Sequence, residues 1–567
     1  MAWALLIFVA AFGVRLYWID QKAGFQFDEP ASFNLAFYNV HPWTDGEVWK
    51  GADIKKSEWT CDPSIASAVM TVYELRKDNR DSPHTNFYYS LLRLWWIGND
   101  GKTSISSLKW RGCGLNLLFF VGTFWGAFAL FKRLFGGENK GVICAGLVAA
   151  TLNTGAISNT ILIRPYALQE MFLVLFTLWA VTLLSKLRND EKIVSPLNRW
   201  LYGLLTALTL LAAYFSVVYV VLLFALLLFF AFRGSEKGTV PFLCETFVVG
   251  VVLATVIYPN YPLGFFIGRA GDVASNFALT NFVKNIVGSV YGLSGVLNYW
   301  LYYTPVLILL IAFGIWRYVS FKKASSATEG FSLKGVESAL LNSRWLPLLL
   351  AGIALVWAGG VMFLAPAESK TLRYVVAIFP ILSLAIPWLA YSYNGCLRKV
   401  YIFLSIAVFL VASVAAEKSG QTFFKISPYR IVSTDAAEES VQRLSCWKLF
   451  RDPICAMAFV FPNEKEAYEQ IIPPSSSPVV IAGEKYAGGI RLMSPYFRDS
   501  QRFKCINDID DPGALLEIVS REKTKVVIAN RRDGELPEGI FYSTKKDLAY
   551  DFSAYTIDNE SVADGEK

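Results

Sequence analysis

The sequence predicts an all-α polytopic membrane domain of about eleven transmembrane helices, followed by a small C-terminal α/β soluble domain. Hydrophobic residues make up 54% of the 567-residue chain and charged residues only 17%, which is more apolar surface than one soluble core can bury. Apolar stretches of about 17 to 25 residues, the length that crosses a bilayer, recur as far as residue 416. Beyond that point the composition becomes that of a soluble domain.

Eleven spans fit the apolar stretches, and nine or thirteen remain as alternatives. The first stretch has no basic leader and no small-residue cleavage site, so we expect it to be retained and not removed as a secretory signal. The stretch 201–232 is too long for one crossing and is divided at Tyr214, Phe215 and Ser216. The predicted spans are 2–19, 113–131, 141–160, 165–185, 200–214, 216–232, 241–260, 301–319, 345–364, 373–391 and 399–416.

The basic residues predict a cytoplasmic N-terminus, because they gather in the short loops that follow every second span. The loop 20–111 and the C-terminal region then face outward. A net charge of +7 does not indicate nucleic-acid binding, since these residues are distributed among loops and form no basic face. Within the outer loop, the aromatic segment 87–97 is predicted to lie in the membrane interface without spanning it.

Three regions follow from this division of the chain. Residues 1–416 form the membrane domain with its outer loop, residues 417–557 an extracytoplasmic α/β domain, and residues 558–567 a disordered acidic tail. Within the second region, 478–482 and 525–529 predict buried strands and 514–519 predicts a helix between them.

The eight cysteines show no metal-ligand spacing, so no metal site is indicated. Cys446 and Cys455 lie nine residues apart in the C-terminal region. A disulfide between them and two free thiols both remain open, because a bridge requires that this region be extracytoplasmic.

Asp28 and Glu29, between Phe27 and Pro30, are the candidate catalytic carboxylates just beyond the first span. Glycosyl transfer to a hydroxyl or amine needs a base that accepts the nucleophile's proton as the anomeric carbon becomes oxocarbenium-like, and a carboxylate suits this role. The alternative is that the pair marks the N-terminus of a helix that begins at Pro30.

Three cations on the predicted outer side run against the charge trend: Arg164, Lys370 and Arg373. Cations at the membrane interface can neutralise a lipid-phosphate leaving group, and arginine can donate two parallel hydrogen bonds to the phosphate oxygens. The alternative is snorkelling toward headgroups. Tyr166 and Tyr374, each near one of the arginines, are expected to be membrane anchors first and site residues second.

A third candidate segment runs from Asp81 to Tyr89 and passes from polar to aromatic residues. His84 is placed to orient donor phosphate or sugar, with Tyr88 in the aromatic run beside it. The alternative for His84 is an ordinary surface or hydrogen-bonded histidine.

Together these segments resemble the GT-C glycosyltransferases, specifically protein O-mannosyltransferase-like and lipid A aminoarabinose or galacturonic acid transferase-like enzymes. Asp28-Glu29 matches the acidic outer-loop motif of that superfamily. The segment from His84 to Tyr89 is similar to its His-Pro-Pro-Leu-Tyr-Tyr motif, without the two prolines. Arg164-Pro165-Tyr166 resembles its Arg-x-Tyr segment, and Arg373-Tyr374 with Pro380 its late Arg-Tyr segment. The resemblance covers residues 1–416.

The resemblance implies inverting transfer from a polyprenyl-phosphate sugar to a protein, lipid A or envelope-glycan acceptor, at the outer face of a bacterial inner membrane. Asp28 is then the catalytic carboxylate, Glu29 its orienting neighbour, and Arg164 and Arg373 the donor-phosphate ligands. No cofactor is strictly required, although two carboxylates are available for a divalent metal.

Two other classes remain open, a transporter or flippase of a lipid-linked saccharide and a non-catalytic scaffold. Transporters usually show paired repeats and ionisable groups near the bilayer midplane. Here the charged residues gather at the outer face, which favours the enzyme.

Overall fold

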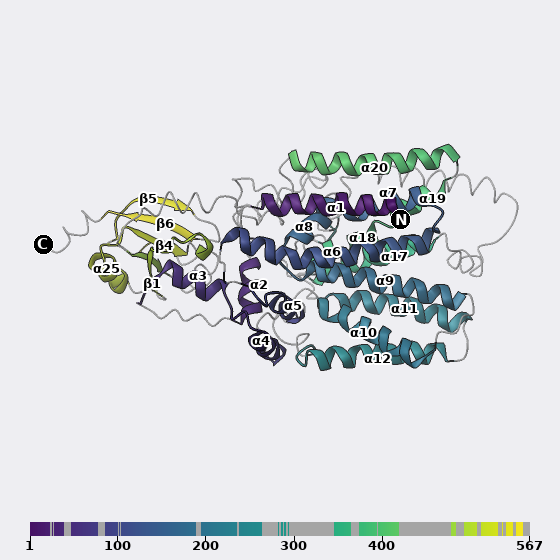
Figure 1. Ribbon diagram of the computed structural model, residues 1–567, viewed down its shortest axis with the longest axis horizontal. Coiled ribbons are helices and arrows are strands. Elements are labelled where there is room, and N and C mark those ends of the chain that lie inside the picture. The colour runs from purple at the N-terminus through teal and green to yellow at the C-terminus, as the bar shows by residue number, and fades with distance from the viewer. Residues whose placement is uncertain are drawn as a thin grey trace.

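Long apolar helices lying side by side form most of the computed structural model, and a six-stranded sheet lies beyond one end of them (Figure 1). The structure describes residues 1–22, 25, 28–38, 47–77, 85–99, 101, 104–188, 194–234, 238–262, 282, 285–286, 289–290, 293, 345–364, 374–393, 395–418, 478–482, 493–506, 512–530, 536, 540–547 and 552–558.

Five described helices are long and apolar enough to cross a membrane, and a bent helix pair raises the number to six. This chain is therefore an integral membrane protein. The five are α1 (Ala2–Gln21), α6 (Ile105–Phe135), α9 (Tyr166–Arg188), α12 (Thr239–Ile257) and α17 (Leu346–Leu364), and the bent pair is α7 (Lys140–Thr151) with α8 (Thr154–Ile161).

The predicted count of eleven spans is thus only partly confirmed. The stretch 201–232 does divide as predicted, but α10 has 17 residues, at the lower limit of the length that crosses a bilayer, and is not among the five long spans. The span predicted at 301–319 lies outside the described residues. The remaining apolar stretches form α10 (Pro196–Ala212), α11 (Ser216–Gly234), α18 (Phe379–Leu382), α19 (Ala385–Ser392) and α20 (Gly395–Lys418).

A buried arginine of the first span holds the bent pair together. Helices α7 and α8 meet at 53°. Arg15 Nη1 donates to Thr151 O at the end of α7 (2.9 Å), and Arg15 Nε donates to Thr160 Oγ1 in α8 (2.9 Å). The side chain of Asn153 caps α8 by accepting from Ala156 N. These bonds satisfy backbone groups that the break would leave unpaired inside the membrane domain.

The outer loop folds into four short helices, α2 (Asp28–Phe37), α3 (Gly51–Trp59), α4 (Ile65–Lys77) and α5 (Phe87–Trp95). As expected, none of them is long enough to span. Helix α5 buries Tyr88, Tyr89, Leu92 and Arg93 against its neighbours, so one side of its amphipathic pattern serves internal packing. Leu94 and Trp95 are 41% and 40% exposed, and the predicted place of α5 in the membrane interface stays a prediction.

The sheet has the strand order β1-β3-β2-β4-β6-β5. The two predicted strands are its central parallel pair, and the predicted helix, α25 (Pro512–Arg521), precedes β4. Alternate residues of β2 and β4 enter apolar clusters on opposite faces, which explains their continuous hydrophobic runs. The strands are β1 (Val48–Lys50), β2 (Val479–Ala482), β3 (Arg502–Ile506), β4 (Val526–Asn530), β5 (Tyr542–Asp547) and β6 (Phe552–Ile557).

The edge strand β1 belongs to the outer loop, about 430 residues before β2 in the chain. It pairs antiparallel with β3, and the chain then continues directly into α3, where Ile54 joins an apolar cluster of the sheet. Gly51 allows this close contact, because a Cβ there would lie 2.1 Å from Arg498 O. The outer loop and the C-terminal region thus share one sheet.

Trp59, the last residue of α3, connects the sheet domain to α2. Its Nε1 donates to Ser494 Oγ (2.7 Å), which lies in the short helix η6 (Ser494–Tyr496) between β2 and β3. Its ring lies 5.3 Å from the rings of Phe25 and Phe33, the latter on α2. The helix that carries Asp28 and Glu29 is therefore held from both the membrane domain and the sheet domain.

Candidate active site beside the first span

Helix α2 begins at Asp28, so both candidate carboxylates lie in its first turn, with Pro30 in third place. Acidic residues in a first turn favour helix initiation, and proline is tolerated there because its missing N–H needs no partner. The helix expected from Pro30 thus starts two residues earlier. Asp28 is half-buried, whereas Glu29 is fully buried.

Glu29 is engaged in two strong interactions. Its Oε1 lies 2.5 Å from Lys22 Nζ, and the two side chains are 0% and 4% exposed. The same oxygen accepts a hydrogen bond from Ile163 N (2.8 Å). Glu29 therefore ties α2 both to the end of the first span and to the loop between α8 and α9.

That loop is held by side chains from three directions. Ile161 O accepts from Lys22 Nζ (2.9 Å), and Leu162 O accepts from Asn116 Nδ2 (2.6 Å) on α6. The turn closes when Arg164 N donates to Leu162 O (2.8 Å). This network fixes the backbone on which Arg164 stands.

The Arg164 guanidinium lies against the first turn of α2. Its Nη1 is 3.3 Å from both Asp28 O and Ser32 Oγ, and the residue is 5% exposed. Residues 136 positions apart in the chain are thereby brought together, as the sequence motifs predicted. One arginine and two carboxylate residues occupy one small region.

Tyr88 lies in the same region, on α5. Its hydroxyl donates to Asn116 Oδ1 (3.2 Å), and Asn116 in turn holds the α8–α9 loop. Burial, with a smaller contribution from nearby Cys113, raises the pKa of Tyr88 well above its usual range, although Arg164 opposes this rise. Tyr88 therefore remains a neutral hydrogen-bond donor.

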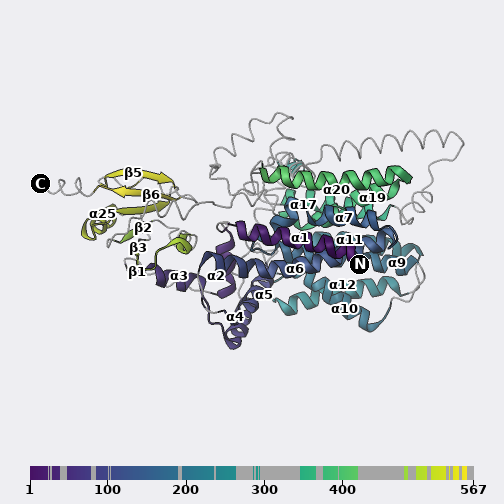
Figure 2. The ribbon, with the colours of Figure 1, turned by 45° about the horizontal axis from the view of Figure 1, so that its top comes forward.

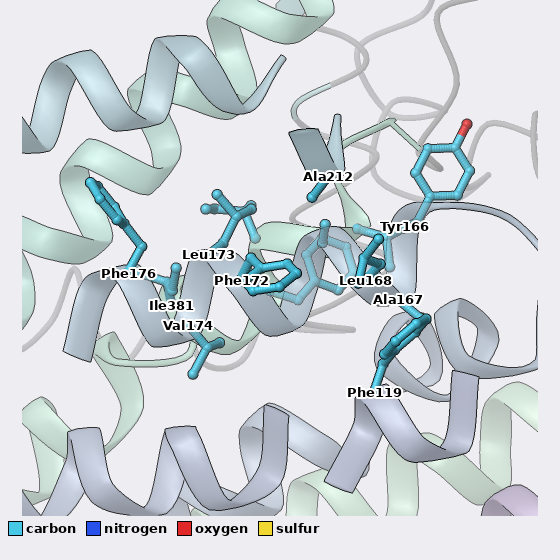
Figure 3. Packing of buried hydrophobic residues seen from close by; sticks show 14 of the residues in the cluster. Phe119, Tyr166, Ala167, Leu168, Phe172, Leu173, Val174, Phe176, Ala212 and Ile381 are labelled. Atoms are coloured by element: carbon cyan, nitrogen blue, oxygen red, sulfur yellow. The ribbon is translucent and has the colours of Figure 1, made fainter. Parts of the chain in front are cut away.

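Tyr166 and Tyr374 were expected to be membrane anchors first, but the structure buries both of them, at 3% and 6% exposed. Their ring centroids are 6.4 Å apart, and Tyr374 also lies 6.2 Å from Phe215. Figure 3 shows Tyr166 at the end of α9 with its hydroxyl directed away from the packed apolar side chains. They are internal residues beside the candidate site.

Three predicted site residues, His84, Lys370 and Arg373, lie outside the described residues, as do Cys446 and Cys455. The residues that follow His84 and Arg373 are described. Thr85 is buried and donates to Leu211 O, and Tyr374 is in contact with Tyr166.

Lys22 is the main site residue that the sequence-based prediction missed. It is a cation just beyond the end of a span, the same signal that identified Arg164, and so it was open to detection. Lys109 supports it from α6 by donating to Asp20 O (2.5 Å) and Lys22 O (3.0 Å). Ser32 and Asn116 carry no such signal.

No group of three histidine, cysteine or acidic residues is assembled for a metal within the part of the chain that the structure describes. A separate cleft of about 520 Å³ lies beside α3, lined mostly by residues of the loop between the first two spans, Lys55, Lys56, Thr60 and Asn99 among them, with Asp499 from the C-terminal region. None of the predicted site residues lines it.

No protein-family model and no curated protein sequence matches the chain. Solved structures do match. Among these, ArnT from Cupriavidus metallidurans bound to undecaprenyl phosphate has a TM-score of 0.50 at 11% identity, over 98% of each chain. Apo ArnT from the same organism gives 0.43 at 11% identity, over 94% of this chain and 97% of that one. AglB, an oligosaccharyltransferase from Archaeoglobus fulgidus, gives 0.31 at 11% identity, over 98% and 74%.

The chain therefore has the fold of the GT-C membrane glycosyltransferases, as the order of its motifs predicted. The likeness to the undecaprenyl phosphate complex of ArnT, which covers 98% of each chain, carries this assignment of the fold.

Proposed function

We propose that this protein is a glycosyltransferase that moves a sugar from a polyprenyl-phosphate donor to an acceptor at the outer face of a membrane, with inversion at the anomeric carbon. The observation that carries the proposal is the contact of the Arg164 guanidinium with the first turn of α2, which bears Asp28 and Glu29. A general base and a phosphate ligand are the two groups that such a transfer needs.

The two carboxylates have different environments, and we assign them different roles. Glu29 is fully buried and paired with Lys22, so it orients α2 and its neighbour. Asp28 is half-buried and is the general base. The acceptor's hydroxyl or amine attacks the anomeric carbon opposite the lipid phosphate, the bond from that carbon to the phosphate oxygen breaks, and Asp28 takes the proton.

Arg164 and Arg373 are the proposed ligands of the donor phosphate, and Lys370, His84 and Tyr88 are proposed as further donor-binding residues. Tyr166 follows Arg164 by two residues and Tyr374 follows Arg373 directly in the sequence, and the contact between the two tyrosine rings supports the assignment of both arginines to one site. The ArnT structure of the same fold is bound to undecaprenyl phosphate, which supports a donor of this chemical class. The acceptor is a glycan, a lipid such as lipid A, or a protein.

We propose further that this site and the sheet domain face the extracytoplasmic side of the membrane, because the basic residues follow the positive-inside distribution. The proposed membrane is a bacterial inner membrane.

The test uses cells that lack the protein and are complemented with wild type, Asp28→Asn or Arg164→Lys. Mass spectrometry of lipid-linked sugars and envelope glycans measures transfer. We expect Asp28→Asn to slow transfer by about 10² to 10⁴-fold with donor binding retained, because only the proton acceptor is lost. Arg164→Lys should weaken donor binding, because a lysine lacks the bidentate fork.

Asp53→Asn, an exposed acidic residue of the same outer loop, is the matched control and should behave as wild type. Chelation with EDTA is expected to leave transfer unchanged, since the cationic side chains neutralise the phosphate. Full transfer by Asp28→Asn would refute the assignment.

One observation favours the alternative of a lipid-linked saccharide transporter. Arg15 and Glu170 are both buried within spans, where ionisable residues often mark a transport path. Arg15, however, is bonded to the α7–α8 break, which gives it a structural role. A transporter would retain its activity with Asp28→Asn, so the same experiment distinguishes the two.

A further inference from the structure

Helix α4 exposes a continuous apolar face. Ile65, Val69, Met70 and Tyr73 are 67%, 59%, 61% and 47% exposed. At about 100° per residue these positions fall on one side of the helix, and the fully buried Ala68 and Leu75 fall on the other. A soluble surface would not normally present such a stripe.

Hydrogen bonds from α5 fix which side of α4 faces outward. Arg93, itself fully buried, donates to Asp62 O (2.6 Å) in the turn before α4 and to Ser67 Oγ (3.1 Å) within α4. Asn86 Nδ2 donates to Leu75 O (2.8 Å) at the other end. The helix is thus attached through its polar side, and rotation to hide the apolar side would break these bonds.

The C-terminal end of α4 is attached to the end of a membrane span. Arg76 Nη2 donates to Val256 O (2.8 Å) in the last turn of α12, and Asn260 Nδ2 donates to Lys77 O (2.5 Å). Figures 1 and 2 place α4 beside α5, at the end of the spans nearest the sheet, with its axis across theirs. It therefore lies at the level where α12 leaves the hydrocarbon, roughly parallel to the membrane plane.

The exposed face of α4 continues the lipid-facing side of α12. Val248, Val252 and Val256 of α12 are all more than half exposed, at 58%, 54% and 57%, and are spaced by one helical turn. Lys77 Nζ lies 3.9 Å from the centroid of the Tyr73 ring. Tyrosine with lysine is a typical residue pair at the headgroup level, where the ring meets the acyl boundary and the ammonium meets phosphate.

We propose that α4 is a membrane-docking helix whose apolar face lies in the headgroup region of the adjacent leaflet. The partner is lipid, with Ile65, Val69 and Met70 toward the acyl chains and Lys77 toward lipid phosphates. Helix α4 contacts both α5 and α2, so this docking also supports the helix that carries Asp28. The proposal depends on no particular transfer reaction.

The test is spin-label accessibility in the full-length protein, with its eight native cysteines replaced by serine and in nanodiscs of phosphatidylethanolamine and phosphatidylglycerol. Met70→Cys carries the label. Val252→Cys, 54% exposed on a span, is the lipid control, and Glu517→Cys, 71% exposed on α25, is the water control.

We expect the ratio of oxygen to nickel-chelate accessibility at position 70 to match that at 252 and to exceed that at 517 several-fold. A ratio equal to that at 517 would show that α4 faces water, and low accessibility to both reagents would show that protein covers it, either another segment or a second copy. Either result overturns the proposal.

A second measurement uses the native chain and needs no cysteine replacement. Photo-crosslinking with a phospholipid that carries a diazirine near its headgroup, followed by peptide mass spectrometry, should give adducts on Met70 or Tyr73. Adducts on α12 without any on α4 would contradict the proposal.

Discussion

The buried pair of Lys22 and Glu29 offers the sharpest test of how the site is held in place. Both side chains are removed from water, and one carboxylate oxygen, Oε1, is shared by Lys22 Nζ at 2.5 Å and Ile163 N at 2.8 Å. Lys22→Met removes the ammonium group from the carboxylate and retains the neutral donor Ile163 N. Breaking a buried ion pair from one side costs about 3–5 kcal/mol of unfolding free energy.

Glu29→Gln perturbs the pair from the other side. Its amide oxygen retains the bond from Ile163 N, but the Lys22 ammonium is left with the Ile161 carbonyl, so we expect a loss of similar size. The double variant removes both charges and should return to within about 1 kcal/mol of wild type. The coupling energy between the two positions is then about 5 kcal/mol or more in magnitude, from two single losses of about 3 kcal/mol or more and a double loss of about 1 kcal/mol.

The assay is equilibrium unfolding in detergent, followed by helical circular dichroism. Lys55→Met is the matched control, because Lys55 pairs with Asp499, which is 74% exposed, and an exposed pair contributes at most about 1 kcal/mol. The reasoning fails if Lys22→Met costs no more than Lys55→Met, or if the two single losses simply add in the double variant.

Two further predictions concern the junction between the outer loop and the sheet domain. Trp59→Phe keeps an aromatic ring against Phe25 but removes the hydrogen bond to Ser494, and should lower the free energy of unfolding by about 0.5–1.5 kcal/mol in the same assay. Trp59→Ala also removes the ring and should lower it by about 3–5 kcal/mol. Equal losses for the two variants would contradict the packing described. Burial raises the pKa of Cys61 from 9.0 to about 11, so below pH 9 its reactive thiolate is about a hundredfold scarcer than that of an ordinary thiol. Iodoacetamide should therefore label Cys61 far more slowly than the exposed Cys396 at pH 8, and the gap should close as the pH passes 11; comparable rates at pH 8, measured by mass spectrometry, would refute this.

Several elements were predictable because their signal is local. Hydropathy located the spans α1, α6, α9, α12 and α17, continuous apolar runs located β2 and β4, and acidic residues before a proline marked the start of α2. Hydropathy did not locate the true start of α6. That helix begins at Ile105, eight residues before the predicted span, with Ser104 as its cap, because its first turns are polar and lie outside the apolar stretch.

The residues of the candidate site could be selected from the sequence, but the bonds among them could not. Asp28, Glu29 and Arg164 stood out as charges at the ends of apolar spans, which is a property of each neighbourhood alone. Nothing local distinguishes the buried Glu29 from the half-buried Asp28. That difference arises from Lys22 and Ile163, and the second of these is 134 residues away in the chain.

By itself the sequence determined that this is a membrane protein with a soluble α/β region and charged residues at the ends of its spans, because composition and periodicity act over one or two helical turns. Only the tertiary structure decided that β1 completes the sheet, that Trp59 joins that sheet to α2, and that α4 exposes an apolar face. These are contacts between segments tens to hundreds of residues apart. Their partners are selected by shape and by the need to satisfy buried polar groups, and no local pattern encodes either.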